Sequence, residues 1–149
     1  MNFISAFDII GPNMIGPSSS HTAGALKIAR VAFQEANKID KTGIKIVKFK
    51  LFGSFSRTYM GHGTDKALLA GIMGFEEEDP RIQNAFEIAK DKGLNYKFIL
   101  NFDIPIEELP HSNSVLISIA TNNGIEFEIM GLSIGGGAIE ILPSNPIKF

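Results

Sequence analysis

Residues 114–134, SVLISIATNNGIEFEIMGLSI, place two apolar stretches on either side of the short polar run Asn-Asn-Gly. β-Branched and aromatic side chains recur in both stretches and favour strands. The Asn-Gly pair accepts the positive φ angles that a type I′ turn requires. The pattern therefore predicts a β-hairpin, with strands over 114–121 and 125–134 joined by a type I′ turn.

Helical periodicity is present upstream of the hairpin. Apolar residues such as Leu26 and Phe33 recur at the spacing of one helix face across 23–38, while charged residues lie off that face. The predicted helices cover residues 23–38, 64–75 and 79–93. In the third helix Asp79 is the expected cap, and Pro80 stands in the first turn, where proline is tolerated.

Two further strands are predicted over 43–54 and 96–102. In the first, the apolar alternation changes phase between Ile46 and Val47, which indicates a bulge or a strand covered on both faces. The glycine triplet at 135–137 is expected to be flexible or closely packed. Because helices and strands alternate early and strands cluster late, we expect an α/β (α+β) fold: one domain over 1–149 in which a mixed sheet packs with helices.

The composition excludes several classes of function. The net charge of −2 gives no basic surface for a nucleic-acid partner. No apolar run is long enough for a spanning helix and residues 1–10 lack the pattern of a signal peptide, so we expect a cytoplasmic protein with no membrane partner. The chain contains no cysteine and therefore cannot supply thiolate ligands to zinc or to an iron–sulfur cluster.

The start of the first predicted helix is unusually polar. Residues 18–22, SSSHT, are five consecutive hydroxyl or imidazole side chains. A helix start needs only one capping oxygen, and the surplus hydroxyls combine with free N–H groups and the positive end of the helix dipole. The segment therefore predicts a site for a small carboxylate or a phosphate, beside which His21 could orient the ligand or move a proton.

The chain has three histidines, His21, His62 and His111, and each lies in a short polar segment at the boundary of a predicted element. They can be ordinary turn and cap residues, since Gly-His-Gly at 61–63 can simply form a tight turn. Alternatively, they are functional groups that bind a ligand or move protons. The acidic run 76–79 is expected to be a solvated loop that also caps the third helix, and metal binding there is a minor prospect.

Four motifs, GPSSSHTAG, GHGTDKAL, HSNS and SIGGGAI, occur in this order over nearly the whole chain. Together they resemble the β domain of bacterial iron–sulfur-dependent L-serine dehydratases (L-serine deaminases). The resemblance implies a fold similar to the allosteric substrate-binding domain of some D-3-phosphoglycerate dehydrogenases. Separate β subunits of this family usually continue into an ACT regulatory domain. This sequence stops about where that domain would begin, so we expect the ACT domain to be absent from this chain, either because the chain is cut there or because this member lacks it.

The resemblance also implies an activity, a cofactor and a partner. Enzymes of this family are L-serine ammonia-lyases, which convert L-serine to pyruvate and ammonia by β-elimination at a 4Fe-4S cluster. The cluster belongs to the α domain, a separate subunit in some organisms, and a chain without cysteine agrees with the role of a separate β subunit. We therefore expect an α-subunit partner, an exposed apolar surface that receives it, and no activity of the chain alone. Whether it also forms a homodimer is left open.

Motif matching implies the residues of the site. The expected substrate-binding residues are Ser18, Ser20, His21, Thr22, Gly61, Gly63, Thr64, Asp65, His111 and Asn113. His62 is the first candidate for the catalytic base, and His21 is the second. The HSNS segment differs from the HPN or HSNG forms typical of the family, so no role is carried over to Ser112 or Ser114. No residue of the chain is expected to bind a metal.

A second class of function fits the same residues. The polar helix start could belong to a regulatory module that senses L-serine or another small anion without catalysing a reaction. A purely structural role ranks last, since it would leave the three histidine motifs without a purpose.

Overall fold

The computed structural model describes residues 22–58, 63–101 and 103–142 of the chain. Its helices are α1 (Ala23–Ile39), α2 (Ser54–Thr58), α3 (Thr64–Ile72) and α4 (Ala85–Asp91), with short 3-10 helices η1 (Pro80–Asn84) and η2 (Ile106–Glu108). Its strands are β2 (Ile44–Gly53), β3 (Asn95–Asn101), β4 (Asn113–Thr121), β5 (Glu126–Gly135) and β6 (Ala138–Leu142).

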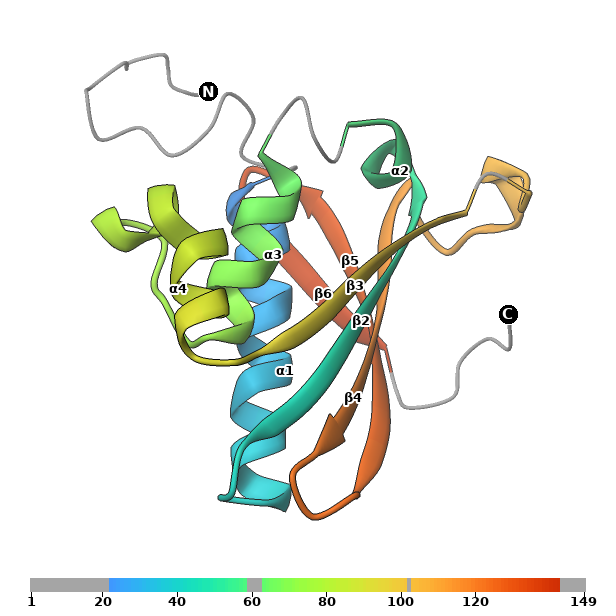
Figure 1. Ribbon diagram of the computed structural model, residues 1–149. Helices are drawn as coiled ribbons and strands as arrows, with labels where there is room; N and C mark the ends of the chain where they lie inside the picture. Colours follow the sequence, from blue (N-terminus) through green and yellow to red (C-terminus); the bar gives the residue numbers. More distant parts are fainter. Residues whose placement is uncertain (1–21, 59–62, 102, 143–149) are drawn as a thin grey trace.

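The strands form one mixed sheet with the order β3-β2-β4-β5-β6. The β2–β3 pair is parallel and the other three pairs are antiparallel. The parallel pair is joined through α2, α3 and α4, whereas β4, β5 and β6 follow one another as neighbours, as Figure 1 shows. The prediction of an α/β (α+β) fold with a mixed sheet is therefore confirmed.

Helices α1, α3 and α4 lie on one side of the sheet, with α1 packed on β5 and α3 packed along α1 (Figure 1). Two glycines allow these elements to approach closely. A Cβ atom on Gly71 of α3 would lie 2.3 Å from the Leu26 carbonyl oxygen of α1, and one on Gly131 of β5 would lie 2.2 Å from the Ile28 side chain. Since real side chains do not approach so closely, only glycine fits at these contacts.

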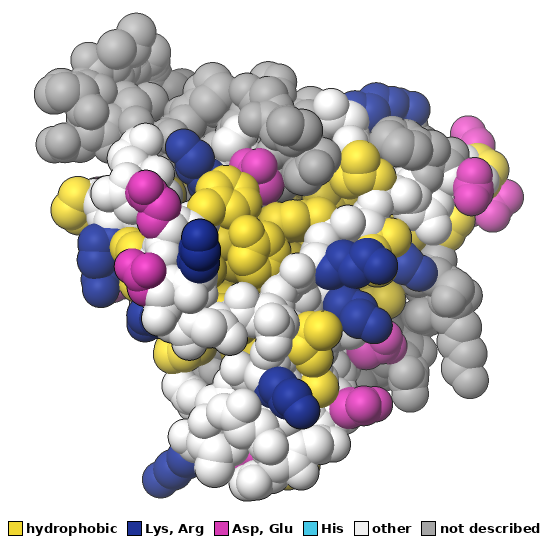
Figure 2. Space-filling model, viewed as in Figure 1, with side chains coloured by type: hydrophobic (Ala, Val, Ile, Leu, Met, Phe, Trp, Pro, Cys, Tyr) yellow, Lys and Arg dark blue, Asp and Glu magenta, His cyan; other side chains and the backbone are white. Residues whose placement is uncertain are grey.

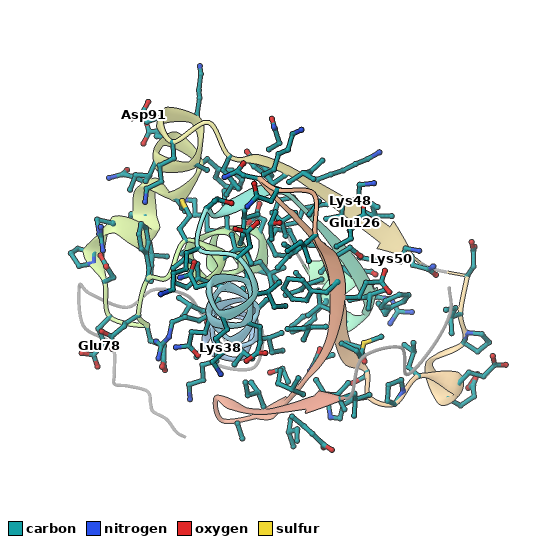
Figure 3. All side chains as sticks on the ribbon, turned by 90° about the horizontal axis from the view of Figure 1, so that it is seen from below. Lys38, Lys48, Lys50, Glu78, Asp91 and Glu126 are labelled. Carbon is teal, nitrogen blue, oxygen red and sulfur yellow. The ribbon has the colours of Figure 1, made fainter. Side chains whose placement is uncertain are left out.

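The opposite face of the sheet is divided into two parts. At one end Phe52, Leu116, Met130 and Leu132 form a small buried cluster with Leu109 from the loop before β4. At the other end charged side chains stand across the strands: Lys48, Lys50 and Glu126 lie on the side of the sheet away from α1 (Figure 3). This alternation of buried and charged faces is typical of an antiparallel sheet with one solvated surface.

Most predicted elements are confirmed, but one predicted helix is divided into two shorter helices. The helices predicted over 23–38 and 64–75 correspond to α1 and α3. The predicted helix over 79–93 is instead η1 followed by α4, although Asp79 caps it as expected by accepting a hydrogen bond from the Arg81 N–H. An irregularity in the pairing of β2 with β4 occurs between Ile44 and Ile46, one position before the predicted change of phase.

The hairpin is confirmed, but its predicted type I′ turn is wrong. The Gly124 N–H bonds the Thr121 carbonyl and the Thr121 N–H bonds the Ile125 carbonyl, which closes a three-residue connection over 122–124. Gly124 has φ +86°, as expected where a three-residue hairpin loop ends in a left-handed residue. The glycine triplet at 135–137 is likewise a tight turn, and it leads into β6, a strand that the sequence patterns did not predict.

Within the described ranges, no helix is both long and apolar enough to cross a lipid bilayer.

Candidate functional site

The structure describes six of the eleven expected site residues. These are Thr22, Gly63, Thr64, Asp65, His111 and Asn113. The other five, Ser18, Ser20, His21, Gly61 and His62, lie outside the described residues. The serine run and both candidate bases therefore have no described geometry.

Two helix N-termini meet at one end of the fold. Thr22 precedes α1 and Gly63 precedes α3, and a Cβ atom on Gly63 would lie 3.9 Å from the Thr22 methyl group. The Thr22 side chain makes no capping hydrogen bond, and Gly63, with φ +74°, has no side chain with which to cap. Both positive helix ends therefore point to a common region, which favours a negatively charged ligand there.

Thr64 supplies an unusual group at this position. Its side chain is fully buried, yet its Oγ1 has no hydrogen-bond partner among the residues described. A buried hydroxyl without a partner costs about 1–3 kcal/mol. Such an atom at the first residue of α3 is explained if a ligand completes its hydrogen bonding.

Asp65 follows in the first turn of α3. Its carboxylate accepts a hydrogen bond from the Lys66 N–H at 2.7 Å. Burial raises the pKa of the Asp65 carboxyl above its ordinary value, and the bond from Lys66 opposes that shift. A carboxyl group with a raised pKa keeps a proton more readily, which is common near functional sites.

The HSNS segment is held rigidly at the start of β4. The Ser112 carbonyl accepts a hydrogen bond from the Ser54 N–H at 2.7 Å, and the Ser114 hydroxyl donates to the His111 carbonyl. The Asn113 N–H donates to His111 Nδ1 at 3.0 Å, so this ring nitrogen acts as a hydrogen-bond acceptor. The Asn113 side chain is different, because its Oδ1 is buried and has no partner within the described part of the chain.

The last motif completes the same end of the sheet. A Cβ atom on Gly24, in the first turn of α1, would lie only 2.0 Å from the Ser133 hydroxyl of β5. Asn113 lies one residue beyond the Ser114–Leu132 pair, which places it level with Ser133 on the face toward α1. Lys27 of α1 donates to the Gly137 carbonyl at 2.8 Å. The described parts of three motifs therefore contact one another around the start of α1, and the HSNS segment lies at the same end of the sheet.

Ser133 is a site residue that the sequence patterns did not identify. It is fully buried and lies within the SIGGGAI motif, but its position in a strand gave no sign of the contact with Gly24. The available signal was its polarity at an inward-facing strand position, where apolar residues are usual.

These groups include hydrogen-bond donors that suit a negatively charged ligand group and an acceptor that suits a donor group of the ligand. Helix N–H groups and the Thr64 hydroxyl suit a carboxylate, while the Asn113 amide oxygen is an acceptor. Among the described residues no group of three His, Cys, Asp or Glu side chains is arranged to hold a metal ion.

Comparisons with known proteins match this chain over most of its length. The family model described as serine dehydratase beta chain matches residues 5–141. The chain is 49% identical over 147 residues to the L-serine dehydratase beta chain of Peptoniphilus asaccharolyticus, covering 99% of this chain and 63% of the relative. It is 46% identical over 149 residues to the probable L-serine dehydratase beta chain of Bacillus subtilis (strain 168), covering 97% and 62%.

A more distant relative is the L-serine dehydratase 2 of Escherichia coli (strain K12), which is 28% identical over 152 residues, or 91% of this chain and 33% of that protein. The chain thus spans a little under two thirds of the two beta chains and one third of the Escherichia coli protein. The family match extends across all four motifs, and on this evidence the chain belongs to the serine dehydratase beta chain family.

Proposed function

We propose that this chain is the β component of a cytoplasmic L-serine dehydratase, which deaminates L-serine to pyruvate and ammonia by β-elimination. Membership of the serine dehydratase beta chain family supports the reaction. One structural observation supports the location of the site. Two helix N-termini meet beside the fully buried Thr64 hydroxyl, which has no described hydrogen-bond partner. That arrangement suits the carboxylate of an amino acid.

The chemistry assigns separate tasks to the polar groups. β-Elimination removes the α-proton and releases the β-hydroxyl, so a base and a fixed substrate carboxylate are both needed. Thr22, Gly63 and Thr64 hold the carboxylate from the helix side, together with the serine run before Thr22. His62 is the proposed base, with His21 as the alternative, because imidazole exchanges protons near neutral pH.

An iron–sulfur cluster, implied by the family resemblance, does not fit this chain's own residues. The sequence contains no cysteine, and the described residues contain no cluster of metal-ligating side chains. We therefore assign a 4Fe-4S cluster to the α partner and derive no step through it here.

We place the α partner against the edge strand β3. Tyr96, Phe98 and Leu100 stand on the helix side of β3 only partly covered, and Figure 2 shows hydrophobic side chains gathered between α3 and β3. Ser56 links this edge to the site end of the sheet, because its hydroxyl donates to the carbonyl of Asn101 at the end of β3. Permanent complexes usually bury a large and fairly apolar surface, which supports this edge as the position of the partner.

Reconstitution tests the proposal. The chain is mixed with its cluster-loaded α partner under anaerobic conditions, and pyruvate is followed after addition of L-serine. Pyruvate formation that depends on both chains is the expected result. Full activity of the α partner without this chain would refute the proposed role.

A sensor of L-serine or another small anion is the second candidate, because the two helix N-termini belong to this chain alone. Calorimetry on the isolated chain separates the two functions. Clear binding of L-serine or phosphate without a partner supports the sensor. No binding alone, followed by binding after assembly, supports a shared catalytic site.

A further inference from the structure

The outer face of the sheet, on the side away from α1, carries its charges in two separate groups. Lys48 of β2 and Lys97 of β3 are direct neighbours in the register, and Glu126 and Glu128 stand two residues apart on β5. The central strand β4 runs between these groups and presents Ser118 opposite both Lys48 and Glu128. One side of this face is therefore positive and the other side is negative (Figure 3).

This arrangement is unfavourable within a single copy of the chain. Like charges directly opposite each other on neighbouring strands repel, as Lys48 and Lys97 do. Within the described residues neither lysine makes an ion pair, and Glu128 only accepts a hydrogen bond from the Ser118 hydroxyl at 3.0 Å. Two strand spacings, about 10 Å, separate the strand of Lys48 from that of Glu128. Opposite charges supplied by another surface would relieve both groups.

A hollow of about 540 Å³ lies over β4 between the two charged groups. Lys48 lines it on one side, Glu126 and Glu128 line it on the other, and Ser118 and Ala120 lie in its floor. Because serine and alanine are short, the charged side chains of an opposing surface have room to extend into this hollow.

A second copy of the chain supplies the complementary surface. When two copies face each other across a two-fold axis that runs along β4, β2 of one copy lies over β5 of the other. Lys48 then faces Glu128 of the second copy, and symmetry repeats the contact. Two sheets that pack face to face lie about 10 Å apart with their strands nearly aligned, a separation that a lysine and a glutamate side chain together span.

We infer that the chain associates with a second copy of itself through this outer face, as a symmetric dimer in which the Lys48 side of one copy covers the Glu128 side of the other. The inference does not depend on the proposed reaction, because none of these charged residues is among the expected site residues. Its contacts are mainly electrostatic, so the dimer is sensitive to salt.

Sedimentation equilibrium of the chain tests the inference. The wild type is expected to dimerise with a dissociation constant that rises from about 0.1 to about 1 M salt, since the Debye length falls from about 10 to about 3 Å. Lys48→Glu places a like charge opposite Glu128, and Glu128→Lys places one opposite Lys48. Each variant alone is therefore expected to dimerise at least about 100-fold more weakly. A wild type that stays monomeric would overturn the inference.

An equimolar mixture of the two variants tests the symmetry directly. In a mixed dimer both contacts again join opposite charges, so the mixture is expected to recover an affinity close to that of the wild type. The double variant Lys48→Glu/Glu128→Lys is expected to recover it alone. Circular dichroism establishes that each variant is folded. Folded variants that remain monomeric when mixed, or single variants that dimerise as well as the wild type, would overturn the inference.

Lys38→Glu and Glu78→Lys are the matched controls. Both side chains are exposed and lie away from the outer face, as Figure 3 shows, and the variants make the same two changes of charge. They are expected to leave dimerisation unchanged. Equal losses in the control and outer-face variants would contradict a specific interface. A monomeric wild type whose binding to the α partner is lost in Lys48→Glu would also overturn the inference, because it would assign this face to the α partner.

Discussion

Gly24 of α1 lies directly against Ser133 of β5, so close that a Cβ atom on Gly24 would be 2.0 Å from the Ser133 hydroxyl and 2.9 Å from its Cβ. This contact sets how near the first turn of α1 can come to the sheet. It places Thr22 at the start of the helix above the same end of the sheet as Asn113. The geometry of the candidate site therefore depends on a residue that has no side chain.

Gly24→Ala is expected to destabilise the fold. Alanine favours a helix over glycine by about 1 kcal/mol, but overpacking of a tight contact costs about 1–3 kcal/mol, and at 2.0 Å the overpacking dominates. Urea denaturation measures the loss. The double variant Gly24→Ala/Ser133→Gly removes the opposing atoms, so recovery of stability relative to the two single variants tests the cause. Additive effects would contradict it.

Thr64→Val is expected to stabilise the chain while weakening substrate binding. Valine has nearly the same shape as threonine and removes a fully buried hydroxyl that has no described partner, a gain of about 1 kcal/mol in the free energy of unfolding. In the assembled complex the same change removes the hydroxyl that we propose to hold the substrate carboxylate, so KM for L-serine is expected to rise.

Thr121→Val is the matched control for this prediction. Thr121 is also fully buried, but its Oγ1 accepts a hydrogen bond from the Ile125 N–H at 3.0 Å. Replacement therefore leaves that N–H without its partner and lowers stability. Equal effects of the two substitutions would show that the Thr64 hydroxyl is not unsatisfied in solution.

Asp40 is expected to make stability depend on pH in the acid range. The Thr42 hydroxyl and N–H, and then the Thr121 side chain and Asn123 N–H, lower the pKa of Asp40 to about 2 against the opposing effect of burial. The unfolded pKa is about 3.9. Since the folded pKa is the lower one, the stabilisation is complete above about pH 4 and is lost as the pH falls toward about 2.

Asp40→Asn tests this dependence through chemical denaturation at several pH values. The stability difference between the wild type and the variant is expected to be constant near neutrality and to shrink below about pH 4. Thr42→Val removes the hydrogen bond that lowers the pKa of Asp40 most. The pH range over which acidification lowers stability is therefore expected to become narrower. A difference that grows on acidification would contradict the assignment.

Leu100→Lys is expected to weaken binding of the α partner. Leu100 is 37% exposed on the edge strand β3, and a charge there must be desolvated when an apolar surface covers it. We expect a loss of affinity of roughly tenfold or more, measured by sedimentation of the mixed chains. Ile125→Lys is the control, because Ile125 is 42% exposed but lies at the other end of the sheet. Equal losses for both variants would refute the β3 interface.

Local patterns predicted the long elements because their periodicity reports burial directly. The helix at 23–38 and the hairpin strands around Asn122 are of this kind. The five-residue helix α2 and the strand β6 are too short for a clear period, and β6 follows three glycines. The turn type was wrong because Gly124 takes the left-handed position at the end of a three-residue loop.

The sequence named candidate site residues but not their arrangement. Polarity at the start of the first helix indicated Thr22, and the family resemblance implied Thr64 and Asn113. Their convergence depends on contacts between distant segments, such as Gly24 with Ser133 and Gly63 with Thr22, which no sequence spacing specifies. Glycine at 24 reflects its close approach to Ser133, whereas glycine at 63 suits its positive φ of +74°, and in neither case does a glycine alone reveal its neighbour.

The central claim is that this chain supplies the polar half of a shared active site. Its most direct test is the initial rate of pyruvate formation from L-serine by the anaerobic complex of the α partner with the His21→Ala/His62→Ala chain, compared with the wild-type chain. Removal of both candidate bases is expected to lower the rate at least about 100-fold, the lower range for loss of a general base, with assembly intact. A wild-type rate in the assembled double variant would contradict the claim.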